Sequence, residues 1–394
     1  MKEEKITITN AQELRQEKCN VPTLRFPNYS GEWQVSSMGK VCTFRKGYGI
    51  SKENLSSDGT PCILYGELYT TYKTAIAKSI KSKTNLDPTI LFHSKKNDVI
   101  IPCSGETAED IATSVCIPYD DILLGGDLTV IRSDLDGAFL SNQINSVRKY
   151  DIARIAQGKS IVHLQADELK KISIAYPTID EQQKISGFID KIDERIEVQN
   201  KIISDLKVLK KELNWLFISR LIKDKEPNCK IEDVIDYEQP TDYIVNSDKY
   251  IVDGGTPVLT ANKAFLLGYT NEKSGIYDKS DCIIFDDFTL DFKYVDFPFK
   301  IKSSAIKILT AKQSIELRYF YEYLVFLNLT TNEHKRHYIS EIATLPLYLP
   351  SMDEQRHVLS VLNAISSKIT VEEKYKIALL TQKKYFLNAM FMRT

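Results

Sequence analysis

Ile174-Ala-Tyr-Pro-Thr-Ile-Asp-Glu-Gln-Gln-Lys-Ile185 recurs later in the chain as Leu347-Tyr-Leu-Pro-Ser-Met-Asp-Glu-Gln-Arg-His-Val358. Each copy opens a long segment in which apolar residues return periodically. The stretches before and between the two copies do not resemble each other. The chain therefore reads as variable block, helix, variable block, helix, and the repeat predicts two unlike domains on one duplicated helical frame.

Both copies continue with apolar residues at heptad spacing, which is typical of a coiled coil. The copies are offset by 173 residues, the distance from Glu181 to Glu354. At this offset Gln199 corresponds to Glu372 and Lys210 to Lys383, so polar residues interrupt both seams at the same two places. The predicted seam consists of Ile185, Ile189, Ile192, Ile196, Gln199, Leu206 and Lys210 in the first copy, and of Val358, Leu362, Ile365, Ile369, Glu372, Leu379 and Lys383 in the second.

A polar seam residue lowers stability but fixes the register of a coiled coil. If the helices pair antiparallel, Gln199 facing Glu372 is a hypothesis for such a lock. A further lysine, Lys376, stands where the first copy has Ile203. We expect apolar replacement of Gln199 and Glu372 together to stabilise the coil and loosen its stagger.

Each predicted helix has a start signal. Pro177 and Pro350 end the preceding strands, and Asp180 and Asp353 are predicted to cap the first free amides. A helix from Asp180 to Ile222 would be about 60 Å long, which is enough to hold two modules a DNA turn or more apart. Intramolecular pairing is favoured over dimerisation because both helices belong to one chain.

Composition bounds the class of protein. The 394 residues suit two or three domains, and 43% hydrophobic and 27% charged residues are typical of a folded soluble protein. The chain shows neither a membrane-length apolar run nor a signal peptide, so we expect a cytoplasmic location without membrane contact. Seven cysteines without a C-x-x-C pair predict reduced thiols and no metal site. A net charge of −1 argues against a free-standing, tight DNA binder.

The variable blocks, about residues 20–175 and 228–349, predict an α+β fold with short strands and many glycine turns. Gly59-Thr-Pro-Cys-Ile-Leu-Tyr65 and Gly255-Thr-Pro-Val-Leu-Thr260 hold matching early positions. Asp98-Val-Ile-Ile-Pro102 and Asp281-Cys-Ile-Ile-Phe285 hold matching later ones. These shared strings are interpreted as sheet scaffold, and the differing loops as surfaces for different ligands.

Familiar catalytic and cofactor motifs are missing from the sequence, which has no G-x-G-x-x-G after a strand, no P-loop, no H-E-x-x-H and no nucleophile elbow. The best enzyme-like fragment is Asp286 with Asp291-Phe-Lys293, which imitates a Mg²⁺-dependent nuclease pattern. An acidic pair near a D-x-K occurs often by chance in a chain rich in lysine and aspartate, so a turn at the rim of the second sheet is the favoured explanation. A coiled-coil adaptor without a DNA role is a further alternative.

Nucleic-acid signals are more widely distributed. Lysine, arginine and hydroxyl groups suit phosphate oxygens, and amide groups suit base edges. Each lysine taken singly reads as a solvated surface residue, and only its grouping with aromatic and amide residues favours DNA contact. The candidate DNA-binding residues are Tyr65, Tyr69, Thr70, Thr71, Tyr72, Lys73, Arg148, Lys149, Arg154, Gln157 and Lys159 in the first block, and Lys263, Tyr269, Asn271, Lys293, Lys302, Lys335 and Arg336 in the second.

Taken together, the two Pro-x-x-Asp-Glu-Gln strings with their long helices, Gly66-Glu-Leu-Tyr69 and Ala156-Gln-Gly-Lys-Ser-Ile-Val-His-Leu164 resemble the specificity subunit of type I restriction-modification systems over nearly the full length. One stretch departs from the pattern: residues 328–340 keep none of the Gln-Gly-Lys string where the second block should echo it. A DNA contact inferred for one block therefore cannot be assigned to the corresponding position of the other block.

The resemblance implies two target-recognition domains, each reading one half of a bipartite double-stranded DNA site, joined by two long antiparallel coiled-coil helices. It implies a subunit that catalyses nothing and docks two methylation subunits, which bring S-adenosylmethionine, and through them restriction subunits, which use ATP and Mg²⁺. The implied divisions are an N-terminal extension 1–19, recognition domain 20–175, helical region 176–227, recognition domain 228–349 and helical region 350–394. The target sequence itself is not readable from the chain.

Overall fold

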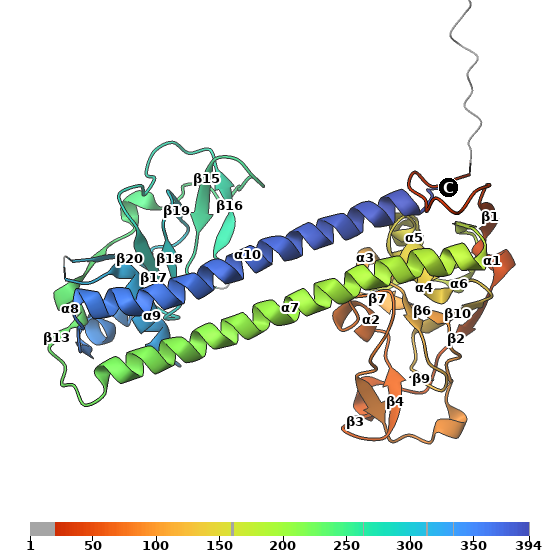
Figure 1. Ribbon diagram of the computed structural model, residues 1–394, viewed down its shortest axis with the longest axis horizontal. Helices are drawn as coiled ribbons and strands as arrows, with labels where there is room; N and C mark the ends of the chain where they lie inside the picture. Colours follow the sequence, from red (N-terminus) through yellow and green to blue (C-terminus); the bar gives the residue numbers. More distant parts are fainter. Residues whose placement is uncertain (1–19, 159–160, 263, 313, 334, 394) are drawn as a thin grey trace, which may run out of the picture. The chain divides into compact units, whose positions relative to one another are not determined.

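The computed structural model describes residues 20–158, 161–262, 264–312, 314–333 and 335–393. The chain forms two compact units (Figure 1): unit 1 comprises Met1–Asn200 with Lys374–Thr394, and unit 2 comprises Lys201–Glu373. Helices α7 (Ile179–Ile222) and α10 (Met352–Met390) each pass from one unit into the other. Among the described residues no helix is both long enough and apolar enough to cross a membrane.

Unit 1 is built on an antiparallel four-stranded sheet. Its strand order is β2 (Cys42–Lys46), β10 (Leu128–Ser133), β6 (Asp98–Pro102) and β8 (Val115–Ile117). Alternate residues of β6 enter different cores, because Val99 and Ile101 pack on one face and Ile100 on the other. A sheet buried on both faces explains the uninterrupted apolar run of β6.

A second sheet of unit 1 has the order β3 (Leu55–Ser56), β5 (Ser82–Thr84), β4 (Thr60–Ile63) and β9 (Leu123–Leu124). Two small pairs complete the strands: β1 (Gln34–Ser37) with β12 (Ser173–Tyr176), and β7 (Ser104–Gly105) with β11 (Val162–His163). The shorter helices are α1 (Met38–Val41), α2 (Glu67–Thr70), α3 (Ala108–Ile111), α4 (Gly137–Asn145), α5 (Lys149–Ile155) and α6 (Ala166–Leu169).

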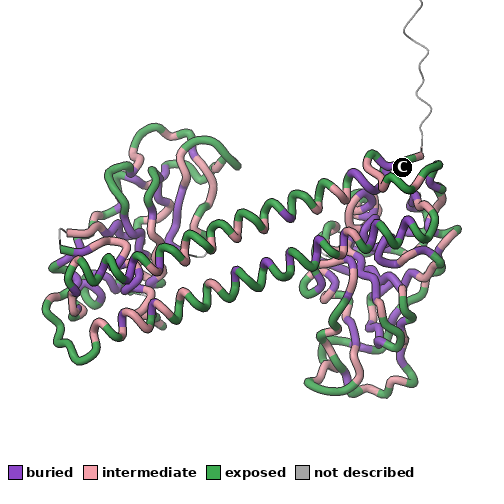
Figure 2. The backbone as a smooth tube through the Cα atoms, in the orientation of Figure 1, coloured by how far each residue is buried: buried purple, intermediate pink, exposed green. Residues whose placement is uncertain are grey.

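Unit 2 repeats this plan with other residues. Its four-stranded sheet has the order β14 (Ile235–Glu238), β20 (Ile306–Ala311), β17 (Cys282–Asp286) and β18 (Phe292–Val295). A second sheet orders β16 (Leu266–Thr270), β15 (Thr256–Leu259) and β19 (Lys300–Ile301), and β13 (Cys229–Lys230) pairs with β21 (Pro346–Leu347). Helices α8 (Ile231–Val234) and α9 (Leu317–Leu327) and a turn of π-helix, Tyr338–Ile342, accompany the sheets. In each unit the buried backbone gathers in these sheets (Figure 2).

The predicted correspondence between the blocks is confirmed by strand pairing. Strand β4 pairs antiparallel with β5 and parallel with β9, and β15 pairs antiparallel with β16 and parallel with β19. Gly59 and Gly255, just before these strands, have φ of +108° and +103°. A Cβ would meet the carbonyl oxygen of Thr84 at 2.3 Å in the first case and that of Thr270 at 2.5 Å in the second, so both turns need glycine.

The long helices run antiparallel to each other within each unit, as the coiled-coil pattern predicts. In unit 1, Ile189, Ile192 and Ile196 of α7 form one cluster with Leu379 of α10. In unit 2, Ile218 of α7 shares a core with residues from the start of α10, such as Leu362. Of the predicted seam, Ile185, Ile189, Ile192, Ile196, Gln199, Val358, Leu362 and Leu379 are buried, and Leu206, Lys210, Ile365, Ile369, Glu372 and Lys383 are half-buried.

The duplicated glutamine explains much of the repeated string. The Gln182 side chain accepts a hydrogen bond from the backbone N–H of Asp136 at 2.9 Å and donates to the carbonyl of Pro177 at 2.9 Å. Gln355 accepts from the backbone N–H of Glu316 at 2.9 Å and donates to the carbonyl of Pro350 at 2.9 Å. Asp136 and Glu316 are the N-cap residues of α4 and α9, so each glutamine joins the first turn of a long helix to the start of a helix in its own unit.

The prediction that Asp180 and Asp353 cap the long helices is wrong. Both lie inside the first turn, and the Asp180 carboxylate accepts instead from the Tyr29 hydroxyl at 2.5 Å. Ser351 caps α10, because its hydroxyl accepts from the Glu354 N–H at 3.4 Å while the Glu354 carboxylate accepts from the Ser351 N–H at 2.8 Å. Serine followed three residues later by glutamate is a capping box. In α10 this pair therefore takes the capping role that had been predicted for Asp353.

The matching lysines at the seam breaks are both ion-paired, with different partners. Lys383 of α10 reaches Asp193 of α7 at 2.5 Å, across the coil. Lys210 reaches Glu322 of α9 at 2.7 Å, so its partner lies outside the coil. Glu372 pairs with Lys368 one turn before it at 2.5 Å. The lock proposed for Gln199 with Glu372 stays a prediction.

Candidate nucleic-acid interface

The first group of candidates lies on and after helix α2 of unit 1. Tyr65, Thr70, Thr71 and Lys73 are exposed and Tyr69 is half-buried. The Glu67 carboxylate holds this segment in place by accepting from the Leu64 N–H at 2.8 Å and the Ser82 hydroxyl at 2.7 Å. The group therefore presents hydroxyls and an ammonium at one surface.

Tyr72, by contrast, points into the protein. Its side chain belongs to the core cluster around Ile63 and Leu68, and it is 8% exposed. Burial raises the pKa of the Tyr72 phenol to about 12. The candidate DNA contact at Tyr72 is thus corrected to a core residue.

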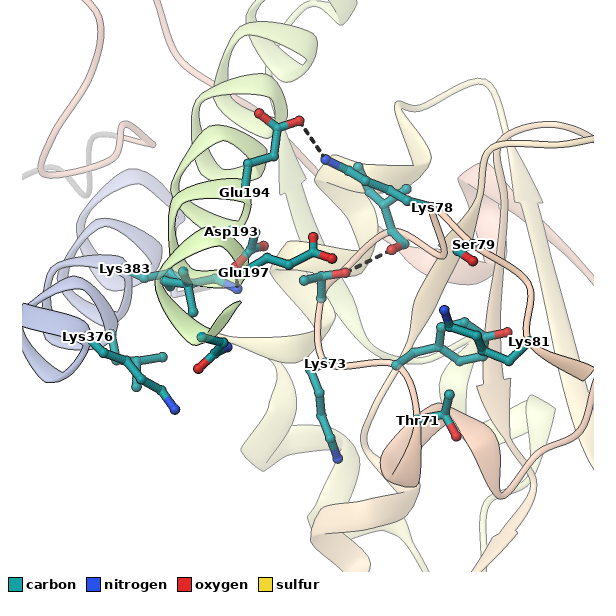
Figure 3. A pocket seen from close by; sticks show the side chains of 16 residues that line it. Thr71, Lys73, Lys78, Ser79, Lys81, Asp193, Glu194, Glu197, Lys376 and Lys383 are labelled. Atoms are coloured by element: carbon teal, nitrogen blue, oxygen red, sulfur yellow. Dashed lines mark hydrogen bonds and ion pairs between the residues drawn. The ribbon is translucent and has the colours of Figure 1, made fainter. Parts of the chain in front are cut away.

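Lys78 joins the segment that follows to helix α7. Its ammonium lies 2.7 Å from Asp190 and 2.9 Å from Glu194. A groove of about 420 Å³ opens beside this contact, between residues 71–81 and the helices α7 and α10 (Figure 3). Lys78, Ser79, Lys81 and Lys376 line the groove together with Thr71 and Lys73, and sequence reasoning did not select these four. The one available signal was Lys376, which breaks the apolar pattern of the repeat.

The second group of unit 1 lies on helix α5. Arg154 is exposed, with its guanidinium 5.7 Å from the centre of the Tyr150 ring, Lys149 is half-buried, and Gln157 is exposed. Arg148 is 2% exposed and donates to the Met392 carbonyl at 2.8 Å and to Asp151 at 3.1 Å. Because its side chain is used inside the protein, the assignment of Arg148 to DNA is corrected to a structural one. Lys159 lies outside the described residues.

Two candidate lysines of unit 2, the half-buried Lys302 and the exposed Lys335, are already neutralised by acidic side chains. Lys302 forms an ion pair with Asp248, and Lys335 lies 2.6 Å from Glu333 and 2.7 Å from Glu341. Asn271 and Arg336 are exposed, and Tyr269 and Lys293 are half-buried in strands. Lys263 lies outside the described residues. We retain Arg336, whose guanidinium lies 5.7 Å from the centre of the Phe288 ring, as the strongest cationic candidate of unit 2.

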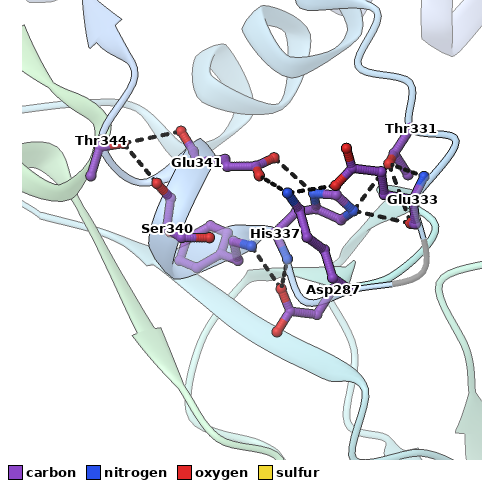
Figure 4. Close-up of polar contacts among 9 residues, drawn as sticks. Asp287, Thr331, Glu333, His337, Ser340, Glu341 and Thr344 are labelled. Carbon is purple, nitrogen blue, oxygen red and sulfur yellow. Dashed lines mark hydrogen bonds and ion pairs between the residues drawn. The ribbon is translucent and has the colours of Figure 1, made fainter.

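A buried polar cluster holds the segment that carries Arg336 (Figure 4). Asp287 is 1% exposed, and its carboxylate accepts from the backbone N–H groups of His337 at 3.0 Å and Tyr338 at 2.7 Å. The His337 side chain, 3% exposed, lies 2.7 Å from the Glu341 carboxylate. From the sequence, His337 is interpreted as a polar surface residue, and this is corrected by its burial, which follows from contacts that are not local.

The aspartates on which the nuclease alternative depends are engaged in local hydrogen bonds and an ion pair. The Asp286 carboxylate accepts from the N–H groups of Phe288 at 2.9 Å and Thr289 at 3.0 Å, which is a turn. Asp291 accepts from the Thr289 hydroxyl at 3.1 Å, and Asp287 lies 3.5 Å from the buried Lys307. In the part of the chain that the structure describes, no group of three or more histidine, cysteine or acidic side chains is placed to hold a metal.

The pair of His337 and Glu341 is expected to make the stability of unit 2 depend on pH. The hydrogen bond to Glu341 raises the pKa of His337 above its ordinary 6.5. The folded state therefore binds the proton more tightly, so this stabilisation is complete below about pH 6.5 and is lost as pH rises through the folded value. At pH 9 we expect the Tyr338–Ile342 amides to exchange hydrogen faster than the rise in the intrinsic chemical exchange rate accounts for. In Glu341→Gln we expect no exchange beyond that intrinsic rise. An equal excess in both proteins would contradict this role of the pair.

Comparison with known proteins agrees with this architecture. Residues 30–208 match the type I restriction modification DNA specificity domain. The type I restriction enzyme EcoR124I/EcoR124II specificity subunit of Escherichia coli is 39% identical over 160 residues, which cover 39% of this chain and 36% of that subunit. The match thus spans little more than a third of the relative's length.

Two solved structures share the fold over nearly the whole chain. The S subunit of a type I restriction-modification system from M. genitalium has a TM-score of 0.61 at 15% identity, covering 95% of this chain and 100% of that one. A chain from a structure on complex assembly and conformational transition of the type I system has a TM-score of 0.53 at 16% identity, covering 92% and 98%. With the duplicated helices and two β-rich units, these findings agree with the resemblance seen in the sequence: residues 30–208 match the type I restriction modification DNA specificity domain, and the chain shares its fold over nearly its whole length with the M. genitalium S subunit.

Proposed function

We propose that the chain is the non-catalytic subunit that gives a type I restriction-modification complex its DNA specificity. The observation that carries this proposal is the shared strand order of the two units with unlike loops on it. A common scaffold with different surface loops suits two readers of different sequences. In this proposal residues 20–175 read one half of a bipartite target and residues 228–349 read the other, with residues 176–227 and 350–394 as the spacer.

Exposed apolar residues support docking of two identical partners. Val198 and Tyr375 are 59% and 42% exposed on the helices of unit 1. At the repeat offset their counterparts are Val371 and Ile202, which are 58% and 38% exposed on the helices of unit 2. Each unit thus offers one equivalent apolar pair, and exposed apolar surface of this kind marks interaction sites. We assign one methylation subunit to each pair.

The chemistry then belongs to the partners. Methylation subunits bring S-adenosylmethionine, and restriction subunits bring ATP with Mg²⁺ and join through them. The specificity subunit acts with them on double-stranded DNA in the cytoplasm. Its net charge of −1 is compatible with DNA binding because the partners supply part of the phosphate contact.

The test is methylome sequencing of cells that express the chain with its methylation subunits. We expect methylation at one two-part sequence with a fixed gap. Exchanging residues 228–349 for the corresponding segment of a relative is expected to change one half of the target and leave the other half and the gap unchanged. Methylation without sequence preference would reject the proposal, and so would a change in both halves.

Each alternative has its own signature. Mg²⁺-dependent cleavage of DNA by the isolated chain, abolished in Asp291→Ala, would favour the nuclease. A full complex that leaves no footprint on DNA containing the methylated sequence would favour the adaptor.

A further inference from the structure

Lys376 is an anomaly in the repeat. Its counterpart in α7 is Ile203, which is 7% exposed, whereas Lys376 is half-buried on α10. A lysine at a seam position costs coil stability. Among the described residues Lys376 has no carboxylate within ion-pairing distance, so no salt bridge accounts for it, unlike the lysines at the other two breaks. The presence of a lysine at this seam position therefore has to be explained by the surface that its side chain lines.

What Lys376 faces is the groove of unit 1 (Figure 3). Five lysines and three carboxylates line this groove. Lys78 and Lys383 are already paired with acidic residues of α7. Lys73, Lys81 and Lys376 remain, with Glu197 as the carboxylate outside these pairs, so the groove keeps an excess of positive charge.

Neutral donors accompany the three lysines. The hydroxyls of Thr71 and Ser79 and the amide of Asn200 belong to the same lining. Ammonium, hydroxyl and amide groups together suit phosphate oxygens. The aromatic member of the lining, Tyr72, is 8% exposed, so its ring offers no platform for a stacked base.

We propose that this groove binds the sugar-phosphate backbone of the target DNA, with Lys73, Lys81 and Lys376 as its cations. The proposal rests on the proposed function and deepens it, since it assigns part of the phosphate binding to the coil itself. Lys376 departs from the repeat because α10 borders the groove at that position. The groove carries no sequence information and fixes the position of the duplex against unit 1.

Lys376→Ile tests the proposal with the residue that the repeat itself uses. We expect the variant to fold, with an unchanged or higher melting temperature. In the complex with methylation subunits, the slope of log K against log salt for the target duplex is expected to fall by about 0.9, because the variant neutralises one phosphate fewer. Affinity should weaken equally on specific and unrelated duplexes, because a lysine bound to a phosphate is blind to sequence.

Lys374→Gln is the matched control, because Lys374 is exposed on the same helix and does not line the groove. A slope for Lys376→Ile no lower than that of the control would overturn the groove assignment. A wild-type complex without sequence-specific binding would instead overturn the proposed function, so the two failures are distinguishable.

Methylphosphonate duplexes, which lack one backbone charge each, locate the phosphate that Lys376 binds. At one phosphate position we expect the substitution to weaken the wild-type complex and to leave Lys376→Ile unaffected. Equal losses of affinity in both proteins at every position would show that Lys376 acts through general charge alone and would reject a seated phosphate.

Discussion

Lys383→Leu is expected to lower the free energy of unfolding of unit 1 by about 3 to 5 kcal/mol, the typical cost of leaving a buried charge without its partner. Asp193 is 7% exposed, and burial raises the pKa of its carboxyl against the opposing effect of Lys383. Trp33, 2% exposed in unit 1, reports the transition in a Trp215→Phe background, because these are the two tryptophans of the chain.

The destabilisation has a characteristic pH dependence. Without Lys383 the folded-state pKa of Asp193 rises further above its unfolded value, so the folded state binds the proton more tightly. The variant should therefore regain stability as pH falls toward about 4 and become less stable as pH rises. A destabilisation that does not change with pH would show that lysine packing, rather than the stranded carboxylate, is responsible.

Replacing both partners of the pair separates its two contributions. Asp193→Leu with Lys383→Leu is expected to be near the wild type or more stable, because an apolar pair removes the desolvation cost of both charges. Lys384→Leu is the control, since Lys384 is exposed on the same helix. A double variant as unstable as Lys383→Leu would contradict this account.

Arg25→Met is expected to destabilise unit 1 by a similar amount, about 3 to 5 kcal/mol. The Arg25 guanidinium donates to both oxygens of the Glu181 carboxylate at 2.7 Å, and the Glu181 side chain is 1% exposed. The same guanidinium donates to the carbonyls of Ser30 and Gly31 at 3.1 and 2.5 Å. Removing the guanidinium leaves the buried Glu181 carboxylate without this partner. It also removes the hydrogen bonds that hold the segment around Arg25.

Hydrogen exchange at the Leu24 amide, which donates to the Ala389 carbonyl at 2.8 Å, measures that release. Arg25→Lys should give an intermediate result, because an ammonium cannot donate to both carboxylate oxygens in the same paired geometry. Lys191→Met, on an exposed residue of the same helix as Glu181, is the control. Unchanged Leu24 protection in Arg25→Met would disprove the role of this ion pair.

Local patterns in the sequence predicted the frame well. The heptad spacing and the Pro-x-x-Asp-Glu-Gln strings predicted α7 and α10, because helix periodicity and the apolar seam are properties of neighbouring residues. The matching Gly-Thr-Pro strings predicted equivalent strands, since a turn that needs positive φ restricts its residue to glycine. The fold class, α+β with paired long helices, is confirmed.

Side-chain orientation was harder to predict. Tyr72 and Arg148 lie in stretches rich in polar and aromatic residues, yet both are buried. The buried Arg148 guanidinium donates a hydrogen bond to the Met392 carbonyl, which is 244 residues away in the chain. The groove residues Lys78, Lys81 and Lys376 come from segments that only the fold brings together. Composition along the chain indicates which segments are polar, but not which of their side chains face solvent.

The joints made by Gln182 and Gln355 have a consequence for how such a protein diversifies. Each glutamine binds a backbone N–H, of Asp136 in one unit and of Glu316 in the other, and therefore recognises the beginning of a helix and no particular side chain. A recognition domain can change nearly every residue and still bind the long helix through this hydrogen bond, provided that one of its helices begins where the glutamine side chain reaches it. Recombination between relatives within the Pro-x-x-Asp-Glu-Gln strings would exchange whole readers and leave both joints intact.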